Sequence, residues 1–295
     1  MKKSLVFRGA ATALVTPFTE KGIDYLAFAK MIDFQLANGI DALVVCGTTG
    51  ESATLTDDEK KELVAFAVRQ VRGRVPVIAG TGSNDTRKAV ALSEHAAAVG
   101  ADALLVVTPY YNKCTQKGLV EYYNDIASAS GLPFIAYSVP ARTGMRIEPE
   151  TAARIAENKL AVGIKDAGES ISDTARIISL CGDSLPLYSG NDDRILPLLS
   201  IGAKGVVSVM SNMIPAEVKR LCTLFFDNDA RGAAELQSAL FPLCEILKCE
   251  INPIPIKAAL AEMGLCENLL RAPLTAITPE NKNALIKTIK SLNFR

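Results

Sequence analysis

The chain has 295 residues, of which 49% are hydrophobic and 22% are charged, a composition typical of a globular protein with one large core. Lysine plus arginine equals aspartate plus glutamate at 32 each, so the charge balance favours neither nucleic acid nor an anionic membrane as a partner. No apolar stretch is long enough to cross a bilayer, and the single histidine, His95, excludes metal centres built on several histidines.

The N-terminus and the cysteines indicate a cytoplasmic protein. The first residues, MKKSLVFRGAATALVTPF, carry two lysines as a signal peptide does, but Arg8 interrupts the apolar part and Pro17 ends it. We therefore expect a first strand there. The seven cysteines are odd in number and form no C-x-x-C pair, which indicates free thiols in a reducing compartment.

A repeated pattern along the chain predicts parallel strands. In residues 36–47, 97–109 and 199–211, a helical segment ends at a glycine that can adopt the left-handed conformation, and a short, continuously apolar run follows. Continuous apolarity is typical of a parallel strand that is covered on both faces. Eight such strands are expected to begin near Gly9, Ala42, Val75, Ala103, Pro133, Ala161, Leu185 and Gly205.

Helical patterns separate these strands. Thr56 and Glu59 have the spacing of a capping box, and residues 83–85 offer an N-cap for the next helix. Alternating strands and helices predict an α/β fold, a (β/α)8 TIM barrel. The alternative is an open, doubly wound sheet, but the first strand ends in LVTPF, without the glycine-rich nucleotide loop of such sheets.

The strand pattern ends at about residue 212. The segments AEVKRLCTLFF, AAELQSALFPLCEILKCE, IPIKAALAEMG and ENKNALIKTIKSLN all predict helices, and Pro253 and Pro255 suit a helix start. We expect a barrel domain in residues 1–224 and a small, all-helical C-terminal domain in residues 225–295.

Lys165 ends an apolar run in AVGIKDAG, although lysine is seldom buried without a partner. Active sites of such barrels lie at the C-terminal ends of the strands. Removal from water disfavours the charged form of an amine, and a neutral amine attacks a carbonyl to form a Schiff base. This favours a class I aldolase or lyase. The alternative is a structural ion pair of Lys165 with Asp166 or Glu51.

Other strand ends carry groups that suit this chemistry. Tyr137, Thr48 and Tyr111 have hydroxyls that can relay protons. The glycine-rich turn at 47–50 presents amides to a substrate carboxylate, and it lacks the G-K-[ST] ending of a P-loop. Arg142 predicts a clamp for a second carboxylate, with a surface ion pair as the alternative.

Six motifs follow one another over nearly the whole chain: GTTGES at 47–52, TPYYN at 108–112, YSVPARTG at 137–144, GIKDA at 163–167, SGND at 189–192 and NPIPIKAAL at 252–260. Together they resemble the dihydrodipicolinate synthase family. The resemblance implies that the chain condenses pyruvate with L-aspartate 4-semialdehyde to 4-hydroxy-tetrahydrodipicolinate, in diaminopimelate and lysine biosynthesis. It also implies a homotetramer and no metal or organic cofactor.

The resemblance assigns roles to the strand-end residues. Lys165 forms the pyruvate Schiff base, and Tyr137, Thr48 and Tyr111 relay protons, with Tyr111 reaching into the site of the neighbouring subunit. The implied substrate-binding residues are Thr49 for the pyruvate carboxylate, Arg142 for the semialdehyde carboxylate, and Gly190 and Val207 in the pocket lining. Three places depart from the usual motifs of the family: Ser138, GIKDAGES and SGNDD. They flank the residues with assigned roles and replace none of them.

A sister enzyme such as N-acetylneuraminate lyase is the alternative within this chemistry. Such lyases share the lysine and the tyrosine but typically have a serine in a GSTGE turn. Thr48 and the ARTG stretch with Arg142 therefore favour the synthase.

Regulated members of the family bind L-lysine at a subunit interface. Lys88 stands where a glutamate receives the ammonium of the bound lysine, and Asp57 and Lys60 stand where histidines occur in a regulated form. An ammonium beside Lys88 would meet a like charge, so we expect weak or absent inhibition by lysine. The positions that agree with the lysine site are Ser52, Ala53, Asn84 and Tyr110.

Overall fold

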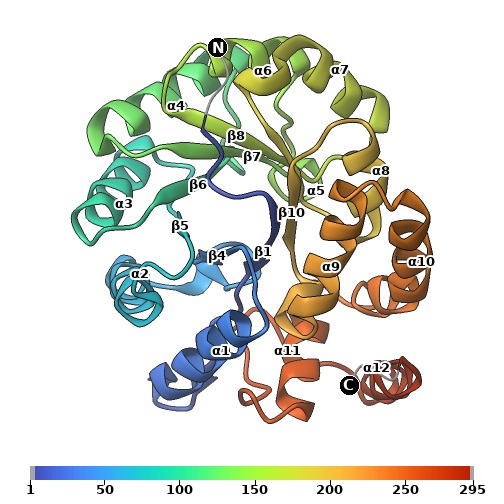
Figure 1. Ribbon diagram of the computed structural model, residues 1–295. Helices are drawn as coiled ribbons and strands as arrows, with labels where there is room; N and C mark the ends of the chain where they lie inside the picture. Colours follow the sequence, from blue (N-terminus) through green and yellow to red (C-terminus); the bar gives the residue numbers. More distant parts are fainter. Residues whose placement is uncertain (1–3, 293–295) are drawn as a thin grey trace.

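The computed structural model describes residues 4–292, and within them eight parallel strands close into a barrel (Figure 1). Each strand pairs with the next in chain order, and the last returns to the first, which confirms the predicted fold class. The strands are β1 (Gly9–Ala13), β4 (Ala42–Val45), β5 (Val77–Gly80), β6 (Ala103–Val107), β7 (Phe134–Ser138), β8 (Ala161–Asp166), β9 (Leu187–Ser189) and β10 (Gly205–Ser208).

Helices form a ring around the barrel (Figure 1). They are α1 (Tyr25–Ala37), α2 (Asp57–Val71), α3 (Thr86–Ala98), α4 (Gln116–Ser130), α5 (Pro140–Thr143), α6 (Pro149–Ala156), α7 (Ile171–Cys181), α8 (Ile195–Ser200) and α9 (Pro215–Phe226). Short 3₁₀ turns lie at η1 (Ser52–Thr54), η2 (Gly182–Ser184), η3 (Asp192–Arg194) and η4 (Met210–Asn212). Across residues 4–292, no helix combines the length and the apolar character that crossing a membrane requires.

The structure confirms the predicted capping box, the predicted N-cap in residues 83–85 and the predicted helix-ending glycines. The Thr56 hydroxyl accepts from the Glu59 amide at 3.2 Å, and the Glu59 carboxylate accepts from the Thr56 amide at 2.8 Å, so the capping box opens α2. Asp85 caps α3. The glycines that end the helical segments have positive φ angles: 74° at Gly39, 86° at Gly100 and 115° at Gly202.

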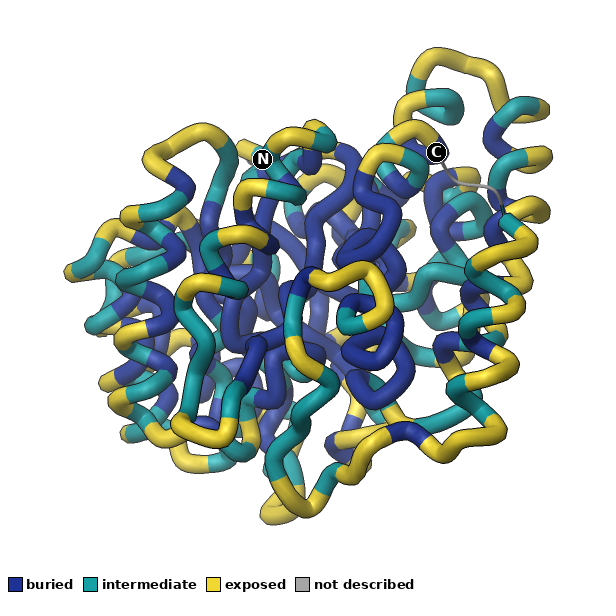
Figure 2. The backbone as a smooth tube through the Cα atoms, turned by 90° about the horizontal axis from the view of Figure 1, so that it is seen from below, coloured by how far each residue is buried: buried dark blue, intermediate teal, exposed yellow. Residues whose placement is uncertain are grey.

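Apolar side chains fill the barrel interior and close its N-terminal end. The ring of Phe7 stacks on Tyr188 with 4.3 Å between centroids, and the Tyr188 hydroxyl donates to the Phe7 carbonyl at 2.8 Å. Val207 packs in the same cluster. Figure 2 shows this buried centre within a more exposed outer layer. Because this end of the barrel is filled, the opposite, C-terminal ends of the strands are left for a binding site.

The last helices lie beside the ring, near α1 and α9 in Figure 1: α10 (Ala230–Ile246), α11 (Ile254–Glu262) and α12 (Pro279–Ser291). Pro255 lies in the first turn of α11, as its position in the sequence indicates. The predicted boundary between residues 224 and 225 falls in the last turn of α9, and the division into two domains stays a prediction. One small element was not predicted, the hairpin of β2 (Phe18–Thr19) and β3 (Gly22–Ile23).

Candidate active site

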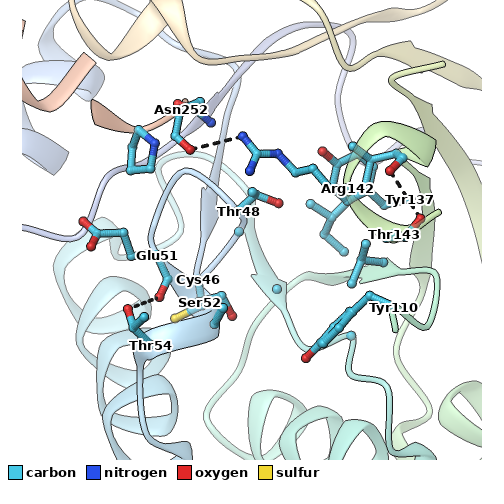
Figure 3. Close-up of a pocket in the computed structure, with 18 of the residues that line it drawn as sticks. Cys46, Thr48, Glu51, Ser52, Thr54, Tyr110, Tyr137, Arg142, Thr143 and Asn252 are labelled. Carbon is cyan, nitrogen blue, oxygen red and sulfur yellow. Dashed lines mark hydrogen bonds between the residues drawn. The ribbon is translucent and has the colours of Figure 1, made fainter. Parts of the chain in front are cut away.

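A cavity of about 330 Å³ opens at the C-terminal ends of the barrel strands (Figure 3). The loops after β4, β5, β6 and β7 line it, and residues 252–253 and 273–274 of the C-terminal segment complete it. We call it the main cavity. Its position is the one expected for the active site of a barrel of this kind.

The turn after β4 brings Thr48 and Thr49 to the main cavity region. The Gly50 amide donates to the Gly47 carbonyl at 3.1 Å, and Glu51 adopts the left-handed conformation with φ of 53°. Thr48 is half-buried and lines the cavity, whereas Thr49 is buried. The Thr49 hydroxyl accepts from the side-chain amide of Asn252 at 3.0 Å, so the C-terminal segment holds this turn in place.

Gly80 is required for this turn to approach β5. A Cβ atom at Gly80 would lie 2.3 Å from the Cys46 carbonyl oxygen, a distance at which the backbone must move. Glycine at this position therefore lets the end of β4 and the end of β5 pack closely beneath the cavity.

Lys165 lies beside Tyr137 because the two residues are register partners on the neighbouring strands β7 and β8. Lys165 is buried, and its Nζ lies 4.1 Å from the centroid of the Tyr137 ring. Tyr137 lines the main cavity, whereas Lys165, which lies beside it, is not among the lining residues. Among residues 4–292, no carboxylate forms an ion pair with Lys165.

The structural ion pair considered from the sequence is not formed, because other groups occupy both carboxylates. The Asp166 oxygens accept from the Thr174 hydroxyl at 2.6 Å and from the Gly168 amide at 3.0 Å. Glu51 pairs with Lys257. Within residues 4–292, Lys165 is thus a buried amine without a paired carboxylate, and removal of a lysine from water is one of the arrangements that favour Schiff-base formation.

Arg142 extends from α5 at the mouth of the main cavity, where Figure 3 shows its guanidinium beside Asn252. Its Nη2 donates to the Asn252 carbonyl at 3.1 Å. Arg142 forms no ion pair with any carboxylate in the described part of the chain, contrary to the surface-pair alternative. The remaining donors of its fork are therefore available to a carboxylate ligand.

Besides Lys165 and Thr49, three further predicted site residues do not line this cavity. Tyr111 is 92% exposed, has φ of 69° and is not among the residues that line the cavity. Val207 lies inside the barrel on β10, and Gly190 follows β9, where its amide donates to the Asp166 carbonyl at 2.7 Å. The structure brings Thr48, Tyr137 and Arg142 together in the lining of one cavity, whose lining does not include Lys165, Thr49, Tyr111, Gly190 or Val207.

The residues expected to match a lysine site are split between two places. Ser52, Ala53 and Tyr110 line the main cavity. Figure 3 shows Ser52 and Tyr110 on the side away from Asn252. Asn84 instead accepts a hydrogen bond from Asn112 through its carbonyl at 3.0 Å.

Sequence reasoning missed a buried ion pair beneath the turn at 47–52. The Lys257 ammonium contacts the Glu51 carboxylate, and both side chains are fully buried. Glu51 also accepts from the Arg271 amide at 2.9 Å. Burial lowers the pKa of Lys257, and Glu51 acts in the opposite direction. The signal was in the sequence, since Lys257 interrupts an apolar helix as Lys165 ends an apolar strand.

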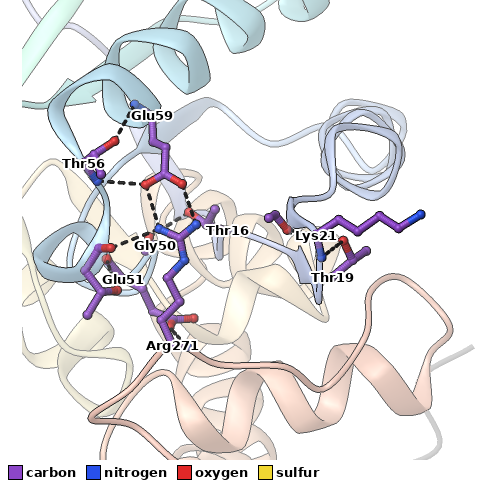
Figure 4. Close-up of polar contacts among 10 residues, drawn as sticks. Thr16, Thr19, Lys21, Gly50, Glu51, Thr56, Glu59 and Arg271 are labelled. Carbon is purple, nitrogen blue, oxygen red and sulfur yellow. Dashed lines mark hydrogen bonds and ion pairs between the residues drawn. The ribbon is translucent and has the colours of Figure 1, made fainter.

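Arg271 extends this network to helix α2 (Figure 4). Its guanidinium forms a two-pronged contact with Glu59, with Nη1 to Oε2 at 2.7 Å, and it also donates to the Thr54 carbonyl at 3.0 Å. The hydrogen bond from Arg271 lowers the pKa of Glu59 to about 2. The network therefore anchors the C-terminal end of the turn that carries Thr48 and Thr49.

Comparison with known proteins gives one consistent result. The sequence model of the dihydrodipicolinate synthetase family matches residues 6–292. A 4-hydroxy-tetrahydrodipicolinate synthase of Alkaliphilus oremlandii is 47% identical over 289 residues, which cover 98% of this chain and 100% of that protein. The enzyme of the same name from Acetivibrio thermocellus is 47% identical over 285 residues, 97% of each chain.

Solved structures agree with the sequences. The crystal structure of dihydrodipicolinate synthase from Aquifex aeolicus has a TM-score of 0.96 and 43% sequence identity, and the match covers 97% of this chain and 98% of that one. The similarity therefore extends over the barrel and the C-terminal helices alike.

Proposed function

Because the chain belongs to the dihydrodipicolinate synthetase family, we propose that Lys165 carries pyruvate as a Schiff base while the enzyme makes 4-hydroxy-tetrahydrodipicolinate. The chain is a lyase with the activity of a 4-hydroxy-tetrahydrodipicolinate synthase, in the diaminopimelate route to lysine. A different pyruvate lyase such as N-acetylneuraminate lyase is not favoured, since relatives that match nearly the whole chain carry the synthase name.

The buried, unpaired amine of Lys165 is the observation that supports this mechanism. The amine adds to the ketone carbon of pyruvate, and loss of water gives the imine. The iminium accepts electrons when a proton leaves the pyruvate methyl group, which gives an enamine. The enamine carbon then attacks the aldehyde of L-aspartate 4-semialdehyde. Attack of the semialdehyde's own amine on the imine carbon closes the ring and releases Lys165.

Proton transfers in these steps are assigned to hydroxyl groups near the amine. Tyr137 lies against Lys165 and lines the cavity, and Thr48 lines the same cavity. We assign Tyr111 to the relay of a neighbouring subunit, because its side chain is exposed and does not line its own cavity. Thr49 and the amides of its turn would hold the pyruvate carboxylate, and Gly190 and Val207 remain proposed parts of the pocket.

An assay with both candidate substrates tests the proposed function. We expect turnover of pyruvate with L-aspartate 4-semialdehyde and no cleavage of N-acetylneuraminate above background. The opposite preference would contradict the assignment of substrates.

Replacing Arg142 by alanine is expected to raise the KM for L-aspartate 4-semialdehyde by about 10- to 100-fold, because a charge-assisted contact is worth roughly 1.5–3 kcal/mol. The KM for pyruvate should change far less, since Lys165 and the turn at 47–50 hold that substrate. Arg146→Ala is the matched control, because Arg146 pairs with Asp173 outside the cavity. Equal effects of Arg142→Ala on both KM values would contradict its role.

L-Lysine is expected to inhibit the enzyme weakly or not at all. The Lys88 ammonium lies 2.8 Å from Asp57, which reduces the repulsion expected from Lys88, but the buried amine of Lys60 adds a positive group on the cavity side of the site. An ammonium ligand is disfavoured beside a like charge. Initial rates with increasing L-lysine provide the measurement, and half-maximal inhibition at submillimolar lysine would refute the expectation.

Further parts of the proposal concern assembly, cofactors and location. A homotetramer is supported by the exposed Tyr111, which needs a neighbouring subunit for the relay. No metal or organic cofactor is proposed, because the lysine imine itself supplies the electron sink. Cytoplasmic location is supported by the seven cysteines, since none of them forms a disulfide within residues 4–292.

A further inference from the structure

Thr16 is a buried residue that neither lines the main cavity nor belongs to the proposed proton relay. It follows the end of β1 and is only 2% exposed. Its hydroxyl donates to the Gly50 carbonyl at 2.7 Å, and Figure 4 shows the two residues next to each other. Thr16 therefore joins the end of the first strand to the turn after β4, 34 residues further along the chain.

The turn packs tightly against the end of β1. A Cβ atom at Gly50 would lie 3.1 Å from the Leu14 carbonyl oxygen and 3.2 Å from the Thr16 hydroxyl oxygen, closer than ordinary van der Waals contact. Glycine at position 50 thus allows the close approach that the hydrogen bond needs. Gly50 is buried, and within residues 4–292 its carbonyl accepts from no group other than Thr16. An apolar side chain at position 16 would therefore leave a buried acceptor without a donor.

The same turn presents two backbone amides that the chain leaves free. The Gly50 amide donates to the Gly47 carbonyl and the Glu51 amide to the Thr48 carbonyl, each at 3.1 Å. In the described part of the chain, the amides of Thr48 and Thr49 donate to no other group. Adjacent free amides suit a carboxylate, and their direction depends on how the turn is held.

We propose that Thr16 is a positioning residue for the keto acid: through the Gly50 carbonyl it holds the turn at 47–50 so that the free amides of Thr48 and Thr49 point at the substrate carboxylate. The inference rests on the proposed role of this turn in binding pyruvate. Asn252 holds a different group of the turn, the Thr49 hydroxyl, so it does not replace the contact at Gly50.

Steady-state kinetics of the full chain test the proposal. Thr16→Val keeps the shape of the side chain but removes the hydroxyl, so we expect the KM for pyruvate to rise about tenfold, which corresponds to 1.4 kcal/mol. The KM for L-aspartate 4-semialdehyde should stay within about twofold. Thr16→Ser retains the donor and should keep the KM for pyruvate near that of the unsubstituted enzyme. Gly50→Ala displaces the turn from the strand and should raise the same KM.

Thr12→Val is the matched control, because it removes a buried hydroxyl from β1 itself. The Thr12 hydroxyl oxygen lies 2.6 Å from Gln35 Oε1 and 2.8 Å from Ser211 Oγ, and among residues 4–292 it makes no hydrogen bond with the turn. Urea unfolding should show lower stability for both valine variants. Only Thr16→Val should change the KM for pyruvate, since KM does not depend on how much of the enzyme is folded.

Failure of this inference and failure of the proposed function give different results. A loss of stability in Thr16→Val without a change in the KM for pyruvate would overturn the inference, and so would a rise in that KM shared by Thr16→Ser. If Thr16→Val does not fold, an unchanged KM for pyruvate in Gly50→Ala would overturn it. Borohydride trapping of pyruvate on Lys165 in the unsubstituted enzyme tests the proposed function separately, because that measurement involves no change at Thr16.

Discussion

Replacing Lys165 by alanine is expected to lower kcat/KM for both substrates by at least about 10⁴-fold, because the variant has no amine beside Tyr137 to form the imine. Every later step, from loss of the methyl proton to attack on the aldehyde, uses that imine. The structure offers no substitute there: Tyr137 is the neighbour of Lys165 on the adjacent strand, and a phenol does not form an imine. Initial rates under varied concentrations of each substrate give the loss.

Two further variants separate chemistry from charge and from folding. Lys165→Arg keeps the positive charge but should be equally inactive, because a guanidinium does not lose its proton in proteins. Lys159→Ala should leave the rate within about twofold, since Lys159 is exposed just before β8. Activity of Lys165→Ala within tenfold of the unsubstituted enzyme would contradict the assigned nucleophile.

Replacing Lys257 by methionine is expected to cost about 3–5 kcal/mol of the free energy of unfolding, because it leaves the fully buried Glu51 carboxylate without its counter-charge. The loss should also lower activity, since Glu51 lies at the end of the turn that carries Thr48 and Thr49. Urea unfolding followed by circular dichroism, at fixed protein concentration, measures the change in stability.

A double variant tests whether the pairing itself is responsible. Glu51→Gln combined with Lys257→Met should cost less than the sum of the two single changes, because neither charge is then left alone. Lys248→Met is the matched control: Lys248 contacts Asp193 near the surface, and such pairs contribute about 0–1 kcal/mol. Strict additivity of the two buried substitutions would contradict the account of the Glu51–Lys257 pair.

The barrel was predictable from the sequence because each of its strands is indicated by residues that lie close together in the chain. Continuous apolar runs preceded by glycine-terminated helices repeat along the chain, and six of the eight strands begin within one residue of the predicted start. The other two, β5 and β9, begin two residues later, directly after Pro76 and Pro186. Proline has no amide hydrogen for the ladder, so it precedes each strand instead of lying within it. The hairpin of β2 and β3 was too short to show a periodic pattern.

The strand-end part of the site was predictable for the same reason, whereas its contacts with the C-terminal segment were not. Thr48, Tyr137 and Arg142 meet in one cavity because the ends of parallel strands converge. Asn252 lies 203 residues from Thr49, and Arg271 lies 220 residues from Glu51. Contacts between residues so far apart leave no repeating pattern in a single sequence. The true partner of Glu51 could therefore not be predicted, and Lys165 remained a possible partner.

Borohydride trapping with pyruvate, followed by peptide mass mapping, tests the central claim most directly. The account predicts one reduced pyruvate adduct per chain, on the peptide that contains Lys165, and no adduct in the Lys165→Ala variant. An adduct on Lys60, Lys257 or any other lysine, or no adduct at saturating pyruvate, would contradict it.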